Sequence, residues 1–172
     1  MLYWSGSRRF SINGTQYVLR PEGGGSSSDD RFVLRKSRQL VEYYVGLASE
    51  FEDANVVELG VNEGGSTAFL AQILRPRRLV ALEIESEPNE PLAEFVKAHG
   101  LGTVVRPRYG ADQANPEQLE AVLKENLGEE RIDLVVDDAS HNLPETIASF
   151  NVLFPRLRPG GAFVIEDWMW DQ

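Results

Sequence analysis

Asn55-Val-Val-Glu-Leu-Gly-Val-Asn-Glu-Gly-Gly-Ser-Thr67 is the stretch that decides the fold. Its first half is a short apolar run that ends in an acid, and its second half has two glycine turns before a Ser-Thr pair. Buried parallel strands are continuous apolar segments, and glycine lets a backbone turn sharply and lie close to a ligand. The stretch therefore predicts a strand, a tight turn and a helix that together hold a nucleotide-like cofactor.

The chain after this stretch alternates between apolar runs and helical stripes. We expect strands at 56–57, 78–84, 103–106, 132–136 and 162–165, and helices at 66–74, 92–99, 119–127 and 143–154. Strands that alternate with helices at this spacing imply right-handed crossovers and a parallel sheet covered on both faces. The predicted fold class is α/β, with a Rossmann-like doubly wound and mainly parallel sheet.

Residues 1–50 precede this pattern and are expected to form a hairpin, a flexible loop and a covering helix. Asn13-Gly14 supplies the positive φ angles of a type I′ turn between two short strands. A Gly/Ser-rich loop at 22–30 follows, and Asp29 or Asp30 could cap the next helix. Residues 51–172 are expected to form the cofactor-binding domain, in one structural unit with 1–50. The covering helix is predicted from apolar positions at helical spacing, namely Val33, Ser37, Leu40, Tyr44 and Leu47.

Composition limits the class of protein. The chain has 172 residues, 42% of them hydrophobic, which suits one domain with a real core. Its net charge of -10 disfavours nucleic-acid and membrane partners. The absence of cysteine excludes disulfides and thiolate chemistry. Met1 to Phe10 has no apolar signal core, so we expect a soluble cytoplasmic protein.

Acidic side chains lie at the ends of four predicted strands. In an open parallel sheet, ligands bind beyond the carboxyl ends of the strands, where the strand order reverses. One acid there is an ordinary surface residue, but four strand ends with the same feature indicate a site. The acids are Glu58, Glu83, the pair Asp137-Asp138 and the pair Glu166-Asp167.

The first glycine stretch resembles the first motif of the class I S-adenosylmethionine-dependent methyltransferases. That motif is an acid, one residue, Gly, three residues and Gly, which Glu58, Gly60 and Gly64 match; Glu83 matches the acid at the end of the family's second strand. The spacing differs from the Gly-x-Gly-x-x-Gly of dinucleotide-binding proteins, which weakens a nicotinamide-dependent oxidoreductase as an alternative. The alternative interpretation of the same residues is a tight turn with solvated acids and no bound cofactor.

This resemblance implies a binding mode for S-adenosylmethionine. The backbone of Gly60 to Asn62 would meet the aminoacyl part, Glu83 would bind the ribose hydroxyls, and Asp112 would reach the adenine. Asp137 could line this pocket or cap a turn. The implied cofactor-binding residues are Glu58, Gly60, Val61, Asn62, Gly64, Ser66, Glu83, Asp112 and Asp137.

A second constellation predicts a metal site. Neighbouring strands bring Asp138, Glu166 and Asp167 to one edge, where three carboxylates repel each other unless they are protonated or bridged by a cation. Oxygen ligands select a hard ion, Mg²⁺ or Ca²⁺, and leave positions for water or substrate hydroxyls. We therefore predict a hard metal ion, Mg²⁺ or Ca²⁺, at these three acids.

The same residues resemble the paired motifs of metal-dependent macrolide-sugar O-methyltransferases, to which cephalosporin-hydroxylase-like and rhamnosyl methyltransferase proteins are related. The motifs are Asp137-Asp-Ala-Ser-His141 and Glu166-Asp167. The resemblance implies that Asp138, Glu166 and Asp167 hold the ion and that His141 is the base. The alternative is that His141 caps the helix that begins near Pro144 and that the acids are solvated.

Other aromatic and histidine side chains have weaker roles in the prediction. His99, at a helix end beside Gly100, is expected to be a packed or capping residue. Trp168 and Trp170 could stack on a sugar or aromatic acceptor, or could be packing surface.

The resemblance covers Phe51 to Trp170 and implies two further strands after the fifth, which are expected to be missing here. The exposed sheet edge could then mediate homo-oligomer formation. The predicted function is S-adenosylmethionine-dependent, magnesium-assisted O-methylation of a hydroxyl on a small molecule such as a sugar or glycosylated natural product. The alternative is a truncated, non-catalytic module that binds the cofactor or a partner.

Overall fold

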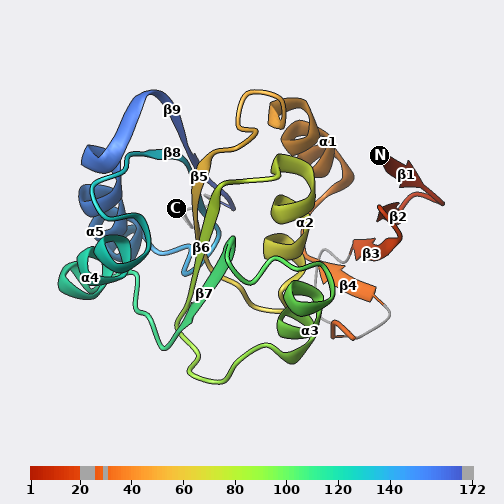
Figure 1. Cartoon of the computed structure of the whole chain (residues 1–172), viewed down its shortest axis with the longest axis horizontal. Coiled ribbons are helices and arrows are strands. Elements are labelled where there is room, and N and C mark those ends of the chain that lie inside the picture. Colours follow the sequence, from red (N-terminus) through yellow and green to blue (C-terminus); the bar gives the residue numbers. More distant parts are fainter. Residues whose placement is uncertain (20–25, 29–30, 168–172) are drawn as a thin grey trace.

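The computed structural model describes residues 1–19, 26–28 and 31–167. Its central sheet, sheet B, has five parallel strands in the order β7-β6-β5-β8-β9. From β5 the chain first adds β6 and β7 on one side and then β8 and β9 on the other, so the strand order reverses between β5 and β8 (Figure 1). The strands are β5 (Asn55–Leu59), β6 (Arg78–Glu83), β7 (Val105–Tyr109), β8 (Ile132–Asp137) and β9 (Leu157–Ile165).

Helices cover both faces of sheet B, which confirms the doubly wound α/β prediction. Helices α1, α2 and α3 lie on one side and α4 and α5 on the other (Figure 1). Side chains of a strand alternate between faces, so Val56 enters the core beneath α2 while Val57 enters the core beneath α4. The helices are α1 (Arg38–Leu47), α2 (Gly65–Leu74), α3 (Glu90–Ala98), α4 (Pro116–Leu127) and α5 (Leu143–Leu153), and a 3₁₀ turn, η1 (Phe154–Arg156), follows α5.

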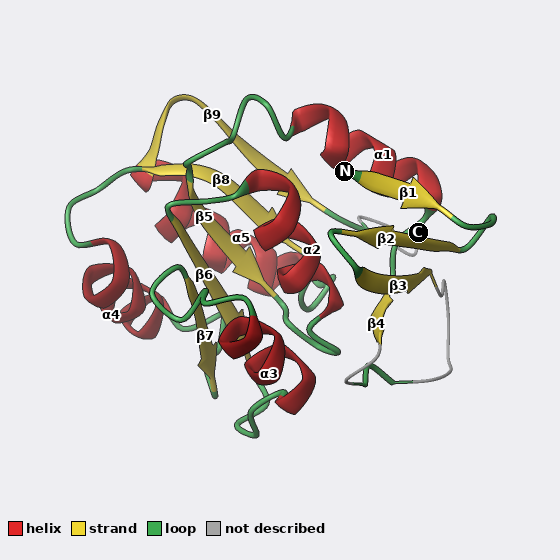
Figure 2. Cartoon of the chain, turned by 45° about the vertical axis from the view of Figure 1, so that its right-hand side comes forward, coloured by secondary structure: helices red, strands yellow, loops and turns green. Residues whose placement is uncertain are grey.

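A second sheet, sheet A, lies beside α1 and α2 (Figure 2). Its strands are β1 (Leu2–Trp4), β2 (Arg9–Ile12), β3 (Thr15–Leu19) and β4 (Arg31–Leu34), in that order, with β4 parallel to β3 and the other pairs antiparallel. Asn13 and Gly14 join β2 to β3 with φ of 50° and 92°, as a type I′ turn requires. The predicted hairpin is therefore confirmed.

Aromatic side chains attach sheet A to the rest of the molecule. Phe10 stacks on Tyr17 with ring centroids 4.9 Å apart, and Phe69 of α2 meets both rings edge-on. The Tyr17 hydroxyl donates to Gln72 Oε1 at 2.8 Å, so the buried phenol also has a polar partner on α2. Sheet A and α2 thus share one core.

The predicted start of the covering helix is wrong. Phe32, Val33 and Leu34 belong to strand β4, and the helix begins at Arg38, where the Ser37 side chain accepts a hydrogen bond from the Leu40 N–H. Three consecutive apolar residues suit a strand that is buried on both faces, and pairing with β3 decided between strand and helix. The proposed caps Asp29 and Asp30 lie outside the described residues. Strand β7 begins at Val105 rather than Thr103, and β9 begins at Leu157, five residues before the predicted Ala162.

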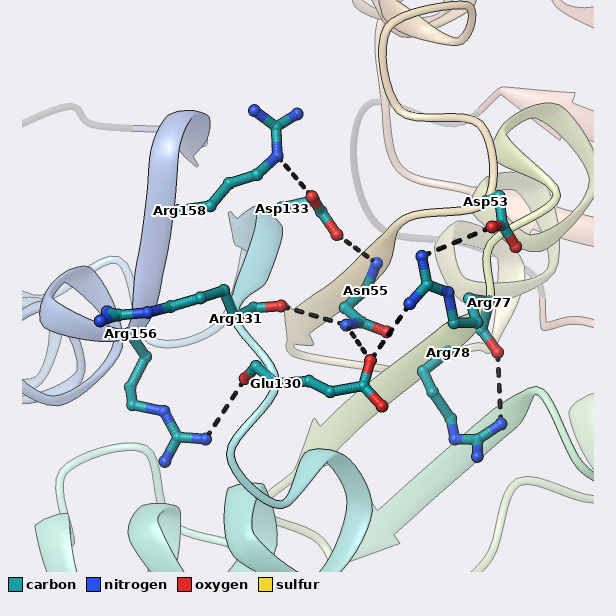
Figure 3. Close-up of polar contacts among 9 residues, drawn as sticks. All are labelled: Asp53, Asn55, Arg77, Arg78, Glu130, Arg131, Asp133, Arg156 and Arg158. Carbon is teal, nitrogen blue, oxygen red and sulfur yellow. Dashed lines mark hydrogen bonds and ion pairs between the residues drawn. The ribbon is translucent and has the colours of Figure 1, made fainter.

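A polar network ties the amino ends of the strands together (Figure 3). The Asn55 N–H donates to Asp133 Oδ2 at 2.7 Å, and the Asn55 side-chain amide donates to Glu130 Oε2 and to the Arg131 carbonyl. Arg77 pairs with Glu130 and with Asp53. These contacts join the starts of β5, β6 and β8, and they occupy the edge of the sheet opposite the predicted site.

Helix α4, with 12 residues, is the longest helix in the described part of the chain. None of the helices in that part is both long and apolar enough to cross a membrane.

Candidate active site

The turn after β5 passes very close to the end of β8, and only glycine fits there. Gly60 has φ of +91°, and a Cβ atom on it would lie 2.4 Å from the Asp138 carbonyl oxygen. At the start of α2, a Cβ on Gly65 would lie 2.1 Å from the Val33 carbonyl oxygen. The turn is therefore packed between β8 on one side and the end of β4 on the other, with no room for a side chain at either glycine.

Glu83, at the end of β6, holds the same turn from its other side. Its Oε2 accepts hydrogen bonds from the N–H groups of Val61 at 3.0 Å and Asn62 at 2.6 Å, and its Oε1 accepts one from Glu85 at 3.2 Å. The carboxylate thus orients the backbone of the turn.

A cavity of about 870 Å³ opens over the carboxyl ends of β5, β6 and β8, where the strand order reverses. Its size is in the range of small-molecule sites. Acidic side chains outnumber basic ones in its lining, which favours a cationic ligand. The acids are Glu63, Glu83, Glu85, Glu87, Asp112, Asp138, Glu145 and Asp167, and the bases besides His141 are Arg35 and Lys36.

The cavity brings together most of the residues that the sequence predicted for the cofactor and the base. Asp112, after β7, accepts a hydrogen bond from the Ala114 N–H at 2.8 Å and lies on the wall beside Glu83. The predicted residues in the lining are Gly60, Val61, Asn62, Ser66, Glu83, Asp112, Asp138, His141 and Asp167.

Four predicted residues do not line the cavity. Glu58 is fully buried beneath the turn and accepts a hydrogen bond from the Thr67 hydroxyl at 2.6 Å. Burial raises the pKa of Glu58 to about 7. Gly64 is the N-cap of α2, and buried Asp137 accepts a hydrogen bond from the Ser149 hydroxyl at 3.2 Å. Glu166 is buried as well, with 5% of its surface exposed.

Asp138, His141 and Asp167 form a cluster in the lining of the cavity. Each offers one ligand atom within 4.8 Å of the other two, and His141 Nε2 lies 3.8 Å from Asp138 Oδ1. His141 and Asp167 have φ of 56° and 49°, a conformation that costs energy for residues with side chains and is concentrated at functional sites. The N-cap of α5 is Asn142, so His141 does not cap this helix.

Lys36, which the sequence did not indicate, lies among the predicted metal ligands. Its Nζ is 2.8 Å from Asp138 Oδ2 and 2.6 Å from both oxygens of Glu166, and Tyr44 donates its hydroxyl to Glu166 Oε1 at 2.6 Å. Burial opposes the ammonium charge, but the two carboxylates outweigh it and raise the pKa of Lys36. No local motif could have marked this residue, because it is 102 and 130 positions away from its partners.

The three predicted metal ligands therefore fit an ion only in part. Asp138 and Asp167 belong to the cluster with His141, and carboxylates are suitable ligands for Mg²⁺. Both oxygens of Glu166 are bonded to Lys36.

The remaining residues considered in the sequence analysis are not among the described residues that line the cavity. His99 is the C-cap of α3, with Nδ1 2.9 Å from the Phe95 carbonyl oxygen and its ring against the Phe95 ring, so its capping role is confirmed. Trp168 and Trp170 lie outside the described residues.

Comparison with known proteins relates this geometry to a family. Residues 57–168 match the family described as "Methyltransferase domain". Over 121 residues the chain is 36% identical to 8-demethyl-8-alpha-L-rhamnosyl tetracenomycin-C 2'-O-methyltransferase of Streptomyces olivaceus, which covers 65% of this chain and 28% of that protein. It is 31% identical over 123 residues to demethylmacrocin O-methyltransferase of Streptomyces fradiae, covering 67% of this chain and 28% of that protein. The chain thus spans about 28% of the length of these curated relatives.

Solved structures show the same fold. MycE, a methyltransferase of the mycinamycin biosynthetic pathway in complex with Mg and SAH, superposes with a TM-score of 0.56 at 26% identity, over 77% of this chain and 32% of MycE. The O-methyltransferase TomG of Streptomyces achromogenes, in complex with SAM, gives a TM-score of 0.60 at 26% identity, over 76% of this chain and 56% of TomG.

Proposed function

Because the chain belongs to the methyltransferase-domain family, we propose that it transfers the methyl group of S-adenosylmethionine to a hydroxyl of a small molecule, a sugar or a glycosylated natural product. One observation carries the proposal. A single acidic cavity joins the Glu83-bound glycine turn to the cluster of Asp138, His141 and Asp167. The cofactor would lie at the first end and the acceptor at the second.

The acidic lining supports a cofactor that carries positive charge on its sulfonium and amino groups. Gly60 to Asn62 and Ser66 would contact the aminoacyl part, Glu83 the ribose hydroxyls and Asp112 the adenine. Glu58, Gly64 and Asp137 would support this end from behind the cavity wall. Glu58 does so through Thr67 in the first turn of α2, and Asp137 through Ser149 of α5.

At the acceptor end, His141 would take the proton of the attacking hydroxyl. The oxygen attacks the methyl carbon in line with the breaking carbon–sulfur bond, the proton passes to the imidazole, and S-adenosylhomocysteine leaves. Asp138 and Asp167 would hold a Mg²⁺ ion, whose charge would make the acceptor hydroxyl more acidic. The side chain of His141 is 40% exposed, so it is accessible from the cavity and can pass the proton on to water.

The first test is thermal unfolding with S-adenosylhomocysteine, with and without Mg²⁺, and with NAD as the control ligand. A ligand at 100 times its dissociation constant adds about 2.7 kcal/mol of stability, and S-adenosylhomocysteine should do so while NAD does not. The absence of a shift with S-adenosylhomocysteine would contradict the cofactor assignment. A shift that a chelator leaves unchanged would leave the cofactor in place and argue against Mg²⁺.

The second test is transfer itself. With S-adenosylmethionine and Mg²⁺, a rhamnosylated tetracenomycin and demethylmacrocin, the acceptor types in the relatives' names, should each be examined by mass spectrometry for a gain of one methyl group. Transfer to a sugar hydroxyl is expected. Tight S-adenosylhomocysteine binding with no transfer to any hydroxylated acceptor would contradict catalysis and leave a binding function.

A further inference from the structure

Lys36 is the most deeply buried cation of the site. Its residue is 3% exposed and its side chain 1% exposed, yet it carries an ammonium group with three donors. Three carboxylate oxygens lie within 2.8 Å of Nζ, namely Asp138 Oδ2 and both oxygens of Glu166. There is therefore one carboxylate oxygen for each of the three N–H donors of Lys36.

Both oxygens of Glu166 already accept hydrogen bonds from side chains of the protein. Its Oε1 accepts from Lys36 and from the Tyr44 hydroxyl, and its Oε2 accepts from Lys36, in a position with 5% of the residue exposed. Asp138 Oδ1 lies 3.8 Å from His141 Nε2, and Asp138, His141 and Asp167 line the cavity together with Lys36. Asp138 thus lies between two groups. Its Oδ2 shares Lys36 with Glu166, and the same residue clusters with His141 and Asp167.

We infer that Lys36 is the resident cation of the Asp138–Glu166 pair, so that a divalent ion binds through Asp138 and Asp167 while Glu166 is not a ligand. This inference rests on the proposed function for the presence of the metal site. It departs from the ligand set that the sequence predicted, because one of the three acids is already neutralised by a side chain of the protein.

The position of Lys36 is built into the fold. Strand β4 pairs with β3 in sheet A and ends at Leu34, and α1 begins at Arg38 with Ser37 as its N-cap, so the short link that carries Lys36 is held at both ends. The Val33 carbonyl packs against Gly65 at the start of α2. Lys36 also lies before residues 57–168, the part of the chain that matches the family.

Metal binding by single variants tests the inference, with Mn²⁺ as a paramagnetic probe followed by electron paramagnetic resonance. Glu166→Gln should keep the Mn²⁺ affinity of the wild type within about threefold, whereas Asp167→Asn should lower it by about tenfold or more. Lys36→Met should raise the affinity about tenfold, because Asp138 Oδ2 and Glu166 become free to bind the ion. A loss in Glu166→Gln equal to that in Asp167→Asn would overturn the inference, and so would a Lys36→Met variant that binds no more tightly than the wild type.

A double variant guards against a folding defect. Lys36→Met leaves two buried acids without a cation, so Lys36→Met/Glu166→Gln, which removes one charge of each sign, is the matched variant if the single one does not fold. It should bind Mn²⁺ at least as tightly as the wild type, and weaker binding would overturn the inference. Calorimetry with S-adenosylhomocysteine on the same proteins tests the proposed function separately. The variants can keep the expected order of Mn²⁺ affinities even if none of them binds the cofactor.

Discussion

At the scale of single residues, His141 combines a strained backbone with an accessible side chain. Its φ of 56° is costly for a residue with a Cβ, and the neighbouring cap position belongs to Asn142. Contacts elsewhere in the fold must offset that cost, and the backbone conformation places the imidazole in the cavity lining, 3.8 Å from Asp138. This placement is the physical reason to assign it proton transfer.

The His141→Ala variant should keep its affinity for S-adenosylhomocysteine and lose turnover by about 10²-fold or more, the usual contribution of a general base. Calorimetry and a single-turnover methyl-transfer assay would measure the two quantities. His99→Ala is the matched control, because His99 lies at the end of α3 away from the cavity, and it should leave turnover unchanged. Retained turnover in His141→Ala would rule out this residue as the base.

Glu58 is a second residue whose environment has a measurable consequence. Its pKa rises from 4.5 to about 7 on folding because burial disfavours the carboxylate. Between these values the native state holds a proton that the unfolded state has lost, so stability falls as the pH rises from about 4.5 to about 7 and then levels off. The loss from this group is about 3 kcal/mol as an order of magnitude.

The Glu58→Gln variant should therefore show a flatter pH dependence than the wild type over this window. Urea unfolding at pH 5 and pH 7.5 gives the change in unfolding free energy between the two pH values for each protein. The wild type should lose about 1 to 3 kcal/mol more than Glu58→Gln over this interval. Glu94→Gln, at an exposed position of α3, is the control and should follow the wild type. Equal slopes for Glu58→Gln and the wild type would mean that Glu58 is ionised in the native protein.

At the scale of an element, the turn between β5 and α2 joins the two halves of the site. Gly60 packs against Asp138, and Glu83 holds the following N–H groups, so one short loop contacts residues proposed for the cofactor and for the acceptor. A shift of this loop would change both ends together.

Gly60→Ala should destabilise the protein by about 2 kcal/mol and abolish binding of S-adenosylhomocysteine, because its Cβ would overlap the Asp138 carbonyl in a backbone with positive φ. Chemical denaturation and calorimetry would measure both effects. Gly46→Ala is the control: this glycine lies within α1 with no atom within 4 Å of an added Cβ, so the substitution should be neutral or slightly stabilising. A Gly60→Ala protein that binds the cofactor normally would contradict the assigned role of the turn.

The elements of sheet B could be predicted because parallel strands buried on both faces are continuous apolar runs, as in Val56-Val57 and Leu134 to Val136. Strand β4 could not, since its apolar residues also fit a helical stripe and only pairing with β3 distinguishes the two. In the site, strand-end position correctly placed Glu83 and Asp138 in the cavity lining. It did not reveal that Glu58 faces the α2 side, nor that Lys36 reaches the site from the link between β4 and α1, because both depend on tertiary packing.

At the scale of the whole molecule, sheet A, α1 and α2 share one aromatic core around Phe69. This residue is fully buried, and its ring lies 6.0 to 6.4 Å from the rings of Phe10, Tyr17 and Tyr44. Phe69 therefore connects sheet A, α1 and α2, and Tyr44 extends this connection to Glu166 in the site.

Phe69→Ala should lower the free energy of unfolding by about 3 to 5 kcal/mol, because it removes a large buried ring and leaves a cavity between the layers. Phe69→Leu keeps most of the volume and should cost less than half as much. Urea unfolding curves of the two variants measure the difference. Similar values for both would show that the packing of sheet A against α1 and α2 does not depend on this ring.

Because Lys36 and Glu166 are 130 positions apart, the ribosome makes the lysine well before the glutamate that it binds. At roughly 5 to 20 residues per second, a ribosome that has made Lys36 takes on the order of 10 s to reach Glu166. Sheet A and α1 can form in that interval, but the ammonium group stays in water until both carboxylates have been made. The charge balance of the cavity is therefore among the last features of the described fold to be completed on the ribosome.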